Sequence, residues 1–311
     1  MQSSPISTIF TIFTFLVLFL QQITSANAAD QKHVTKLKET KHCMECDLSF
    51  ENLNQAQLTG SNLVKVNLKS ALLKNAKLEN SNLINSNLEN ANLAGANLSN
   101  AKLQGSDLTS INLNKSTIRF ANLSKTKLMG ANLSFSDASD SNFSYSNLNS
   151  SSFISAILQN SNFKNTILDN VNFSKADMRR INLFGASIKD GTLVDANLSN
   201  AFMKAADLSG ADLTGANLSK AKLSTANFEG ANLTNANLNK ANLARNIIRV
   251  NLKGANLTGA SLIGANLKGA NLTNANLTDA DFTDANLKKA KLDQVIYCRT
   301  IMPWGEQSDG C

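Results

Sequence analysis

A large apolar residue recurs at every fifth position of this sequence, almost without interruption from Leu48 to Leu243. The clearest copies read AGANL at 94–98 and SGADLTGANLSKAKL at 209–223. Each unit has Leu or Phe at its centre, Ala or Ser two residues earlier, and Asn or Asp between them. Repetition of this quality decides the architecture before any helix or strand is assigned, because every unit must fold like its neighbours.

The period of five indicates short strands joined by corners. It fits neither the 3.6-residue period of a helix nor the two-residue period of a long strand. Within a unit, the small residue and the centre are two apart, so both face inward and the Asn or Asp between them faces outward. We expect the inward Ala or Ser to be small, because a narrow coil has no room for two large residues in each unit. Burial of each central side chain contributes roughly 1.5–3 kcal/mol, so a one-dimensional solenoid is predicted.

The A-(N/D)-L-x-x pattern covers residues 47–292 and resembles the pentapeptide-repeat proteins. The resemblance implies an all-β fold, a right-handed quadrilateral β-helix with four units, about twenty residues, in each coil. About fifty units would form twelve or thirteen coils, and a spacing of about 4.8 Å gives a rod of roughly 60 Å.

A solenoid exposes unpaired edges at both ends, so caps are expected at residues 29–46 and 293–311. The N-terminal cap should contain a short helix from Asp30 to Thr40, with Asp30 as the N-cap and Val34 and Leu37 as an apolar pair. Residues 297–311 (YCRTIMPWGEQSDGC) break the repeat. Both ends resemble segments of exported pentapeptide-repeat proteins, namely a cysteine pair leading into CDL and a terminal CxTxMPxG…GC.

Four cysteines allow three sets of disulfides. A disulfide needs Cα atoms within about 7 Å, whereas the implied rod separates the two cysteine pairs by roughly 60 Å. Within one molecule we therefore expect Cys43–Cys46 and Cys298–Cys311, both oxidised after export.

The CxxC pair has two alternative interpretations. A redox-active pair should begin a helix in a βαβ unit, whereas here the repeat follows directly. A zinc site would need four ligands, which His33, His42, Cys43 and Cys46 would supply. We favour a structural cap over both alternatives.

The N-terminal segment predicts export. Residues 1–29 contain no charged side chain, and the apolar stretch from Ile6 to Leu20 is shorter than the roughly 20 residues of a membrane-spanning helix. Ala26-Asn27-Ala28 has the small-x-small pattern of a cleavage site. We expect a signal peptide at 1–28, cleaved near Ala28, and export to the periplasm, the thylakoid lumen or the outside of the cell. An uncleaved anchor is the alternative, because the first residues lack Lys and Arg. A second apolar run is not seen, so no transmembrane segment is expected in the mature chain.

The middle of the repeat is its least regular part. Ala138 stands at a centre, and phenylalanines follow at four centres ten residues apart, which places them alternately on opposite faces: Phe143, Phe153, Phe163 and Phe173. We interpret the rings as compensation for smaller neighbours, and a ligand cavity at Ala138 as the alternative. The repeat also loses one residue between Leu243 and Leu252, which we place at a corner, with Ile247 as the centre of the short unit.

Outward-facing aromatic and basic residues gather in the same region and form a candidate surface patch. With twenty residues in a coil, Arg119 and Arg179 stand in one column. Such a surface is suited to an acidic or carbohydrate partner, although single exposed apolar residues are also ordinary. The residues of the patch are Arg119, Phe120, Phe135, Tyr145, Arg179, Arg180 and Phe184.

The sequence gives no sign of catalysis. Acidic residues are scattered singly, and no Ser/His/Asp set, P-loop or GxGxxG is present. We therefore predict a non-enzymatic scaffold without a cofactor or metal, whose partner is an unknown protein or envelope component. The alternative is a DNA-mimicking protein that binds DNA gyrase, as some members of the family do. The 30 Lys and Arg against 23 Asp and Glu disfavour a mimic, and export makes a nucleic-acid partner unexpected.

Overall fold

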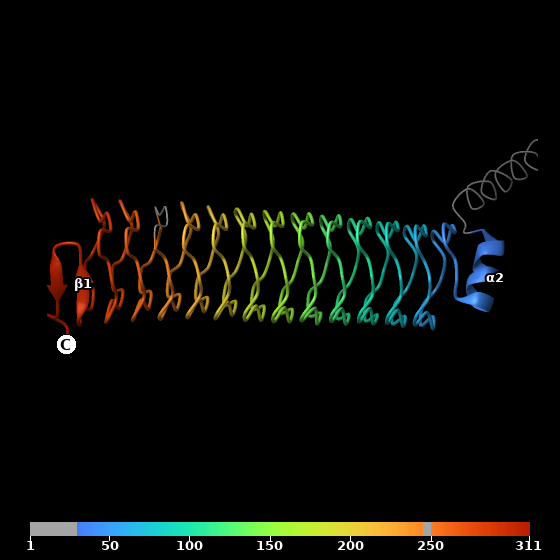
Figure 1. Ribbon diagram of the computed structural model, residues 1–311, viewed down its shortest axis with the longest axis horizontal. Helices are drawn as coiled ribbons and strands as arrows, with labels where there is room; N and C mark the ends of the chain where they lie inside the picture. The colour runs from blue at the N-terminus through green and yellow to red at the C-terminus, as the bar shows by residue number, and fades with distance from the viewer. Residues whose placement is uncertain (1–29, 245–249) are drawn as a thin grey trace, which may run out of the picture.

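The computed structural model describes residues 30–244 and 250–311, which form a long rod (Figure 1). The helix α2 (Gln31–Thr40) lies at the N-terminal end. At the other end, β1 (Thr300–Met302) pairs in antiparallel register with β2 (Gly305–Gln307). Between them the chain winds into coils that are joined by isolated parallel bridges.

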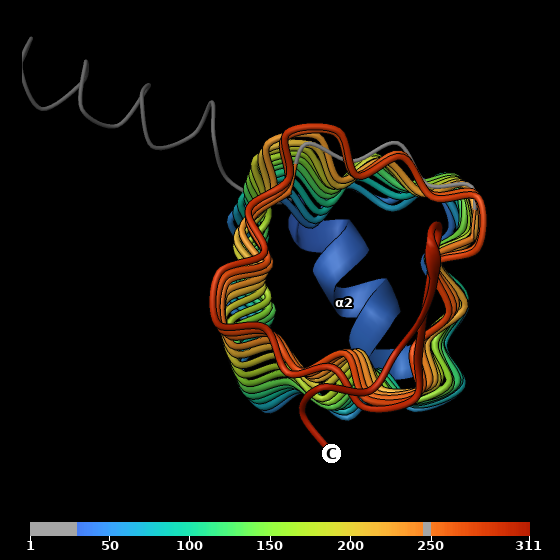
Figure 2. The same ribbon diagram turned by 90° about the vertical axis from the view of Figure 1, so that its left-hand side faces the viewer.

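The bridges fix the size of a coil. The middle residue of a unit pairs with the residue twenty positions later, as in Asn62↔Asn82 and Asn67↔Asn87. The N–H of Leu63 donates to the carbonyl oxygen of Asn82 at 2.7 Å, and equivalent bonds continue along the rod. Each coil therefore holds four units, and residues twenty apart form columns along the rod (Figure 2).

The coil extends beyond the predicted repeat of 47–292 at both ends. The bridges begin at His42 and end at Ile301. Tyr297 and Met302 continue the five-residue spacing of centres after Leu292. The sequence pattern missed these units because their inward residues are not Leu or Phe. Met302 is buried and Tyr297 is partly buried against the same core.

The corner explains the choice of residues between the strands. The last residue of nearly every unit has a positive φ, such as 57° at Asn75 and 70° at Gly95, a conformation that Gly and Asn adopt most readily. The outward Asn supports the turn, because Asn92 Oδ1 accepts a hydrogen bond from the N–H of Ala94 at 3.2 Å. The same contact recurs at most Asn and Asp bridge positions, so the repeated Asn is a turn residue as well as a surface residue.

The interior contains two inward residues from each unit. Centres and the residues two positions earlier are buried along most of the rod, as expected, and partly buried near its ends. The expectation that the earlier residue must be small is wrong at several buried positions: Val66, Ile111, Val171 and Ile181. Gly191 lies one coil after Val171, and a Cβ built on it would lie 3.4 Å from Val171 Cγ1. Space at Gly191 is therefore limited, most tightly by Ile188 Cγ2 at 2.9 Å from that Cβ, while Val171 in the preceding coil lies just in contact.

The four phenylalanines stack inside the coil. Phe143 and Phe163 are stacked with ring centroids 4.6 Å apart, and Phe153 and Phe173 are stacked at 5.0 Å. The two stacks face each other edge-on, with 6.1 Å between Phe143 and Phe153. The prediction of opposite faces is confirmed. Ala138 is fully buried, and none of the surface hollows beside α2 and along the rod is lined by it.

The lost residue changes the register once. Asn232↔Asn251 and Asn237↔Asn256 bridge over nineteen residues, and Asn251↔Asn271 returns to twenty. The coil therefore continues with its faces in phase. The predicted centre of the short unit, Ile247, lies outside the described residues.

The predicted N-terminal helix is present as α2 (Figure 2). Asp30 is its N-cap and accepts a hydrogen bond from the N–H of Lys32 at 2.9 Å. Val34 and Leu37 are buried in the core that runs through the coils. Among the described residues, none of the helices has the length and apolar character needed to cross a bilayer.

Candidate functional site

The CxxC pair lies inside the first coil. Cys43 and Cys46 form a disulfide with Cα atoms 5.4 Å apart, and both are almost completely buried. Cys43 takes a central position and Cys46 the inward position of the next unit. His33 Nδ1 accepts a hydrogen bond from the N–H of Asp47 at 3.1 Å, so this ring joins α2 to the coil.

This arrangement does not favour the alternative interpretations of CxxC. Zinc requires free thiolates, and here both sulfur atoms are bonded to each other. A redox-active disulfide requires access for an attacking thiolate, whereas Cys43 is 0% and Cys46 1% exposed. In the described part of the chain, no cluster of three or more His, Cys, Asp or Glu is arranged to hold a metal ion.

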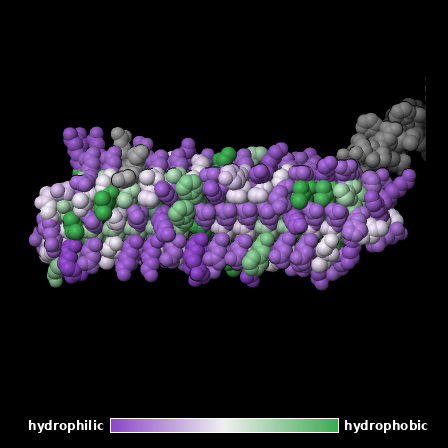
Figure 3. All heavy atoms as spheres, in the orientation of Figure 1, coloured by the Kyte–Doolittle hydropathy of each residue, from purple (hydrophilic) through white to green (hydrophobic). Residues whose placement is uncertain are grey.

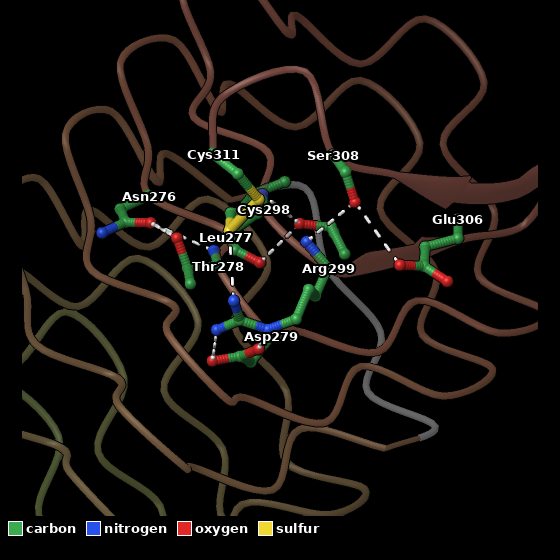
Figure 4. Close-up of a disulfide and its surroundings, with 10 residues drawn as sticks. Asn276, Leu277, Thr278, Asp279, Cys298, Arg299, Glu306, Ser308 and Cys311 are labelled. Carbon is green, nitrogen blue, oxygen red and sulfur yellow. Dashed lines mark hydrogen bonds and ion pairs between the residues drawn. A yellow bond between two sulfur atoms is a disulfide. The ribbon is translucent and has the colours of Figure 1, made fainter.

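The C-terminal disulfide joins Cys298 to Cys311 and closes the chain over the last coil (Figure 4). The guanidinium of Arg299 donates to Asp279 through Nε at 2.6 Å and through Nη2 at 2.9 Å. These hydrogen bonds and the positive charge lower the pKa of Asp279. The N–H of Gly310 donates to the carbonyl oxygen of Tyr297 at 2.7 Å, which holds the tail against the coil. Both predicted cysteine pairs are therefore present.

The candidate surface patch is not one patch. The bridge columns place Arg119, Phe120, Arg179 and Arg180 at one corner of the rod, after the column of Thr117 and Asp177. Tyr145 and Phe184 lie at the next corner along the chain, whereas Phe135 lies at the corner diagonally opposite Tyr145. The sequence analysis placed these residues in one patch because they lie close along the chain. Neighbouring units, however, occupy different faces of the rod.

Three of these aromatic residues occupy an unusual backbone conformation. Phe120, Phe135 and Tyr145 have φ of 57°, 61° and 62°, and more than half of each side chain is exposed. A bulky residue with positive φ is a conformational outlier. The Arg119 guanidinium lies 5.3 Å from the centroid of the Phe120 ring, within the range of a cation–π contact.

The structure adds two residues to the aromatic corner at Phe184. The Phe202 ring stacks on Phe184 with centroids 5.9 Å apart, and Lys164 Nζ lies 5.6 Å from the Phe184 centroid. Lys164 and Phe202 stand 20 and 18 residues away in sequence, so they are neighbours only because one coil contains twenty residues. Sorting outward residues by their position within the coil would have found this cluster.

The surface hollows are open. One beside α2 has a volume of about 390 Å³ and is lined by Leu37, Lys38, Lys41 and residues of 52–58. Another of about 530 Å³ lies between Val250 and Lys289. Their linings contain no paired carboxylates and no histidine, so they offer no acid–base pair for catalysis.

Comparisons with known proteins find several similar solved structures. The solved structure of HetL, a pentapeptide repeat protein involved in heterocyst differentiation regulation from Nostoc sp. strain PCC 7120, is 26% identical over 94% of this chain and 97% of its own, with a TM-score of 0.25. Rfr23 from Cyanothece 51142 is 26% identical over 37% of this chain and 96% of its own, with a TM-score of 0.32. QnrB1, a plasmid-mediated fluoroquinolone resistance protein, is 17% identical over 80% and 90%, with a TM-score of 0.36. No curated protein matches.

The family assignment rests on the repeat itself. The family model described as pentapeptide repeats matches eight copies that together cover most of the chain, at residues 42–80, 71–109, 106–144, 146–185, 193–230, 221–274, 250–288 and 260–296. The coil of five-residue units agrees with this match. The chain therefore belongs to the pentapeptide repeat family, and its coils form a β-helix of parallel bridges.

Proposed function

We propose that this protein is an exported, non-enzymatic rod that acts as a structural or protein-interaction scaffold outside the cytoplasm. The observation that most supports export is the pairing of all four cysteines into two local disulfides, one at each end of the rod. Disulfides persist in oxidising compartments and are rare in the cytosol. Pentapeptide repeat proteins are generally structural or interaction proteins, which favours a scaffold over an enzyme.

The proposed architecture is a quadrilateral β-helix with a cap at each end. In this proposal residues 1–28 are a cleaved signal peptide, and α2 with the Cys43–Cys46 bridge covers the first coil. The tail closed by Cys298–Cys311 covers the last one. These caps shield backbone edges that would otherwise pair with other chains, which suits a scaffold that must remain soluble.

The alternative is a DNA-mimicking protein that binds gyrase. A DNA mimic must present negative potential along its length, whereas this chain has a net charge of +7. The pair of disulfides also argues against a cytosolic partner. No observation on the described residues favours this alternative.

The intact mass of the protein recovered from its native host tests the proposal, measured with and without reduction and alkylation. A mass that begins at Ala29 or Asp30 is expected, with all four cysteines alkylated only after reduction. A full-length mass with free thiols would overturn both the proposed export and the proposed disulfide caps. It would favour a cytosolic location and metal binding by the CxxC pair instead.

A further inference from the structure

The coil separates charges that are mixed in the sequence. One side of the rod carries the bridge column that runs from Asn62 through Asn82 and Lys102. Within residues 48–244, we call this side and the two corners that flank it the basic face. This face carries eleven Lys and Arg but only two acidic residues, Glu79 and Asp140. The rest of the same coils carries seven Lys and eleven Asp and Glu. The basic residues of the face are Lys65, Lys102, Arg119, Lys125, Lys164, Arg179, Arg180, Lys204, Lys220, Lys222 and Lys240.

The charges of this face are mostly uncompensated. Within the described residues, only Lys65, Arg119 and Arg179 form ion pairs, with Glu45, Asp137 and Asp177. The other eight cations have no such partner there. Elsewhere on the coils, three of the seven lysines are paired, for example Lys69 with Glu89 at 2.8 Å. The uneven pairing leaves a positive field along one side of the rod.

The basic face also carries exposed aromatic side chains. Phe120 and Tyr145 stand at its two corners, 54% and 55% exposed, and both have positive φ. Phe202 lies between these corners and is 36% exposed. Phe120 and Tyr145 hold a strained backbone conformation and expose apolar surface without adding to the core, which points to a role at the surface. Figure 3 shows one side of the rod, a mostly polar surface with several separate apolar patches.

We propose that the basic face docks on an anionic lipid bilayer. From Lys65 to Lys240 the cations span almost nine coils, about 40 Å at about 4.8 Å per coil, along a straight rod (Figure 1). Because residues twenty apart are aligned, all of them reach one flat plane together. Aromatic rings with exposed edges suit the headgroup level of a bilayer, and lysine stems extend along apolar surface while the ammonium stays at the phosphates.

A bilayer fits this face better than other polyanions do. The cations occupy both corners and the face between them, so a cylindrical nucleic-acid duplex would meet one line of them at a time. A bilayer is flat over the whole width and attracts each lysine near its surface by about 1 kcal/mol. The proposal adds a docking surface to the scaffold and does not depend on export.

Flotation with phospholipid vesicles tests the proposal. The protein is recovered in the form its host makes, and every variant is processed alike. Vesicles of equimolar phosphatidylglycerol and phosphatidylcholine are compared with pure phosphatidylcholine at several salt concentrations. The triple variant K125Q/K204Q/K222Q removes three exposed, unpaired lysines of the basic face. The matched control K74Q/K115Q/K175Q removes three exposed, unpaired lysines from the corner that borders the opposite side.

We expect binding to the anionic vesicles only, weakened by salt, and a loss on the order of 100-fold in the first triple variant. The control variant should bind within a few-fold of the parent, since its lysines face away. Equal losses in the two variants, or equal binding to neutral vesicles, would overturn the proposal. Duplex DNA and dextran sulfate serve as competing polyanions. If the first triple variant loses more affinity for either polymer than for the vesicles, the basic face would be assigned to that polymer instead. An unchanged melting temperature in both variants shows that folding is intact.

Discussion

Residues 136–176 and 206–243 form coils with the same bridges and corners but different interiors. The first segment places Ser at most inward positions before the centre and Phe at every second centre from Phe143 to Phe173. The second has Ala at all of these positions and Leu at every centre except Phe228. In the first segment the buried hydroxyls are satisfied, as when Ser151 Oγ donates to the carbonyl oxygen of Leu148 at 2.6 Å.

The comparison shows that the backbone of the coil does not depend on one filling. What both segments share is a corner residue with positive φ and an outward residue that bridges to the next coil. The interior has only to be filled column by column, with larger rings where neighbours are small. The following substitutions test this interpretation, from the largest expected effect to the smallest.

Loss of one ring from the aromatic stack should have the largest effect. Phe153→Ala removes a fully buried ring that contacts Phe143, Phe163 and Phe173, so we expect a loss of about 3–5 kcal/mol in the free energy of unfolding. Leu213→Ala lies in the same column within residues 206–243, which we call the regular segment, and should cost about 2–5 kcal/mol. Urea denaturation measures both. If Phe153→Ala costs clearly less than Leu213→Ala, the stack is loosely packed and the comparison of interiors fails.

Filling the space left by Gly191 should be the next most harmful change. A Cβ at this position would lie 2.9 Å from Ile188 Cγ2 and 3.4 Å from Val171 Cγ1, so Gly191→Ala should destabilise by about 1–3 kcal/mol. The cost should fall when Val171→Ala is added, because one of the two crowding side chains is gone. Additive effects in this double-mutant cycle would show that the two coils are not coupled through this column.

Corner aromatics stand in the first segment (Tyr145) and directly before it (Phe135), whereas the corners of 206–243 carry none. Phe135→Asn and Tyr145→Asn should each stabilise the rod by up to about 1 kcal/mol, because Asn tolerates positive φ better than a bulky residue does. The reverse change in the regular segment, Asn235→Phe with φ of 57°, should destabilise by a similar amount. Thermal melting measures all three. A loss of stability on removal of the exposed rings would mean that they pack against the rod.

A pH titration should show the smallest effect. Burial opposes ionisation of Asp177, but hydrogen bonds from Arg179 and Gln159 outweigh it and lower its pKa. Its ionised form therefore stabilises the fold above the unfolded Asp pKa of about 3.9, and this contribution is lost as the pH falls through the lower folded pKa. Asp177→Asn should flatten the dependence of the melting temperature on pH in the acid range.

The control for this titration lies in the regular segment. The pKa of Asp207 is also lowered: burial again opposes ionisation, and hydrogen bonds from Ser209 and the nearby Lys189 outweigh it. Asp207→Asn should flatten the same acid range. An acid dependence that neither substitution changes would place its origin in other carboxylates, such as Asp279 beside Arg299.

Much of the fold could be predicted from the sequence. The spacing of Leu48 to Leu243 gave the inward and outward positions, Asp30 and Leu37 indicated the helix, and the two ends of the rod fixed the cysteine pairs. The candidate surface patch could not be placed in this way. Phe135 and Tyr145 are ten residues apart in sequence and therefore lie at diagonally opposite corners of the rod. Lys164 and Phe202 were overlooked, although both contact the ring of Phe184.

The division has a physical reason. The sequence by itself determined which side chains are buried, because apolar burial and the positive-φ corner both repeat every five residues. The tertiary structure established the twenty-residue coil, which the sequence implied only through a family resemblance. It thereby decided which outward side chains share a face and which coil tolerates Val171 opposite Gly191. The choice of face and of coil depends on backbone hydrogen bonds that join residues twenty apart. These bonds placed the cations of the basic face, from Lys65 to Lys240, on one side of the rod.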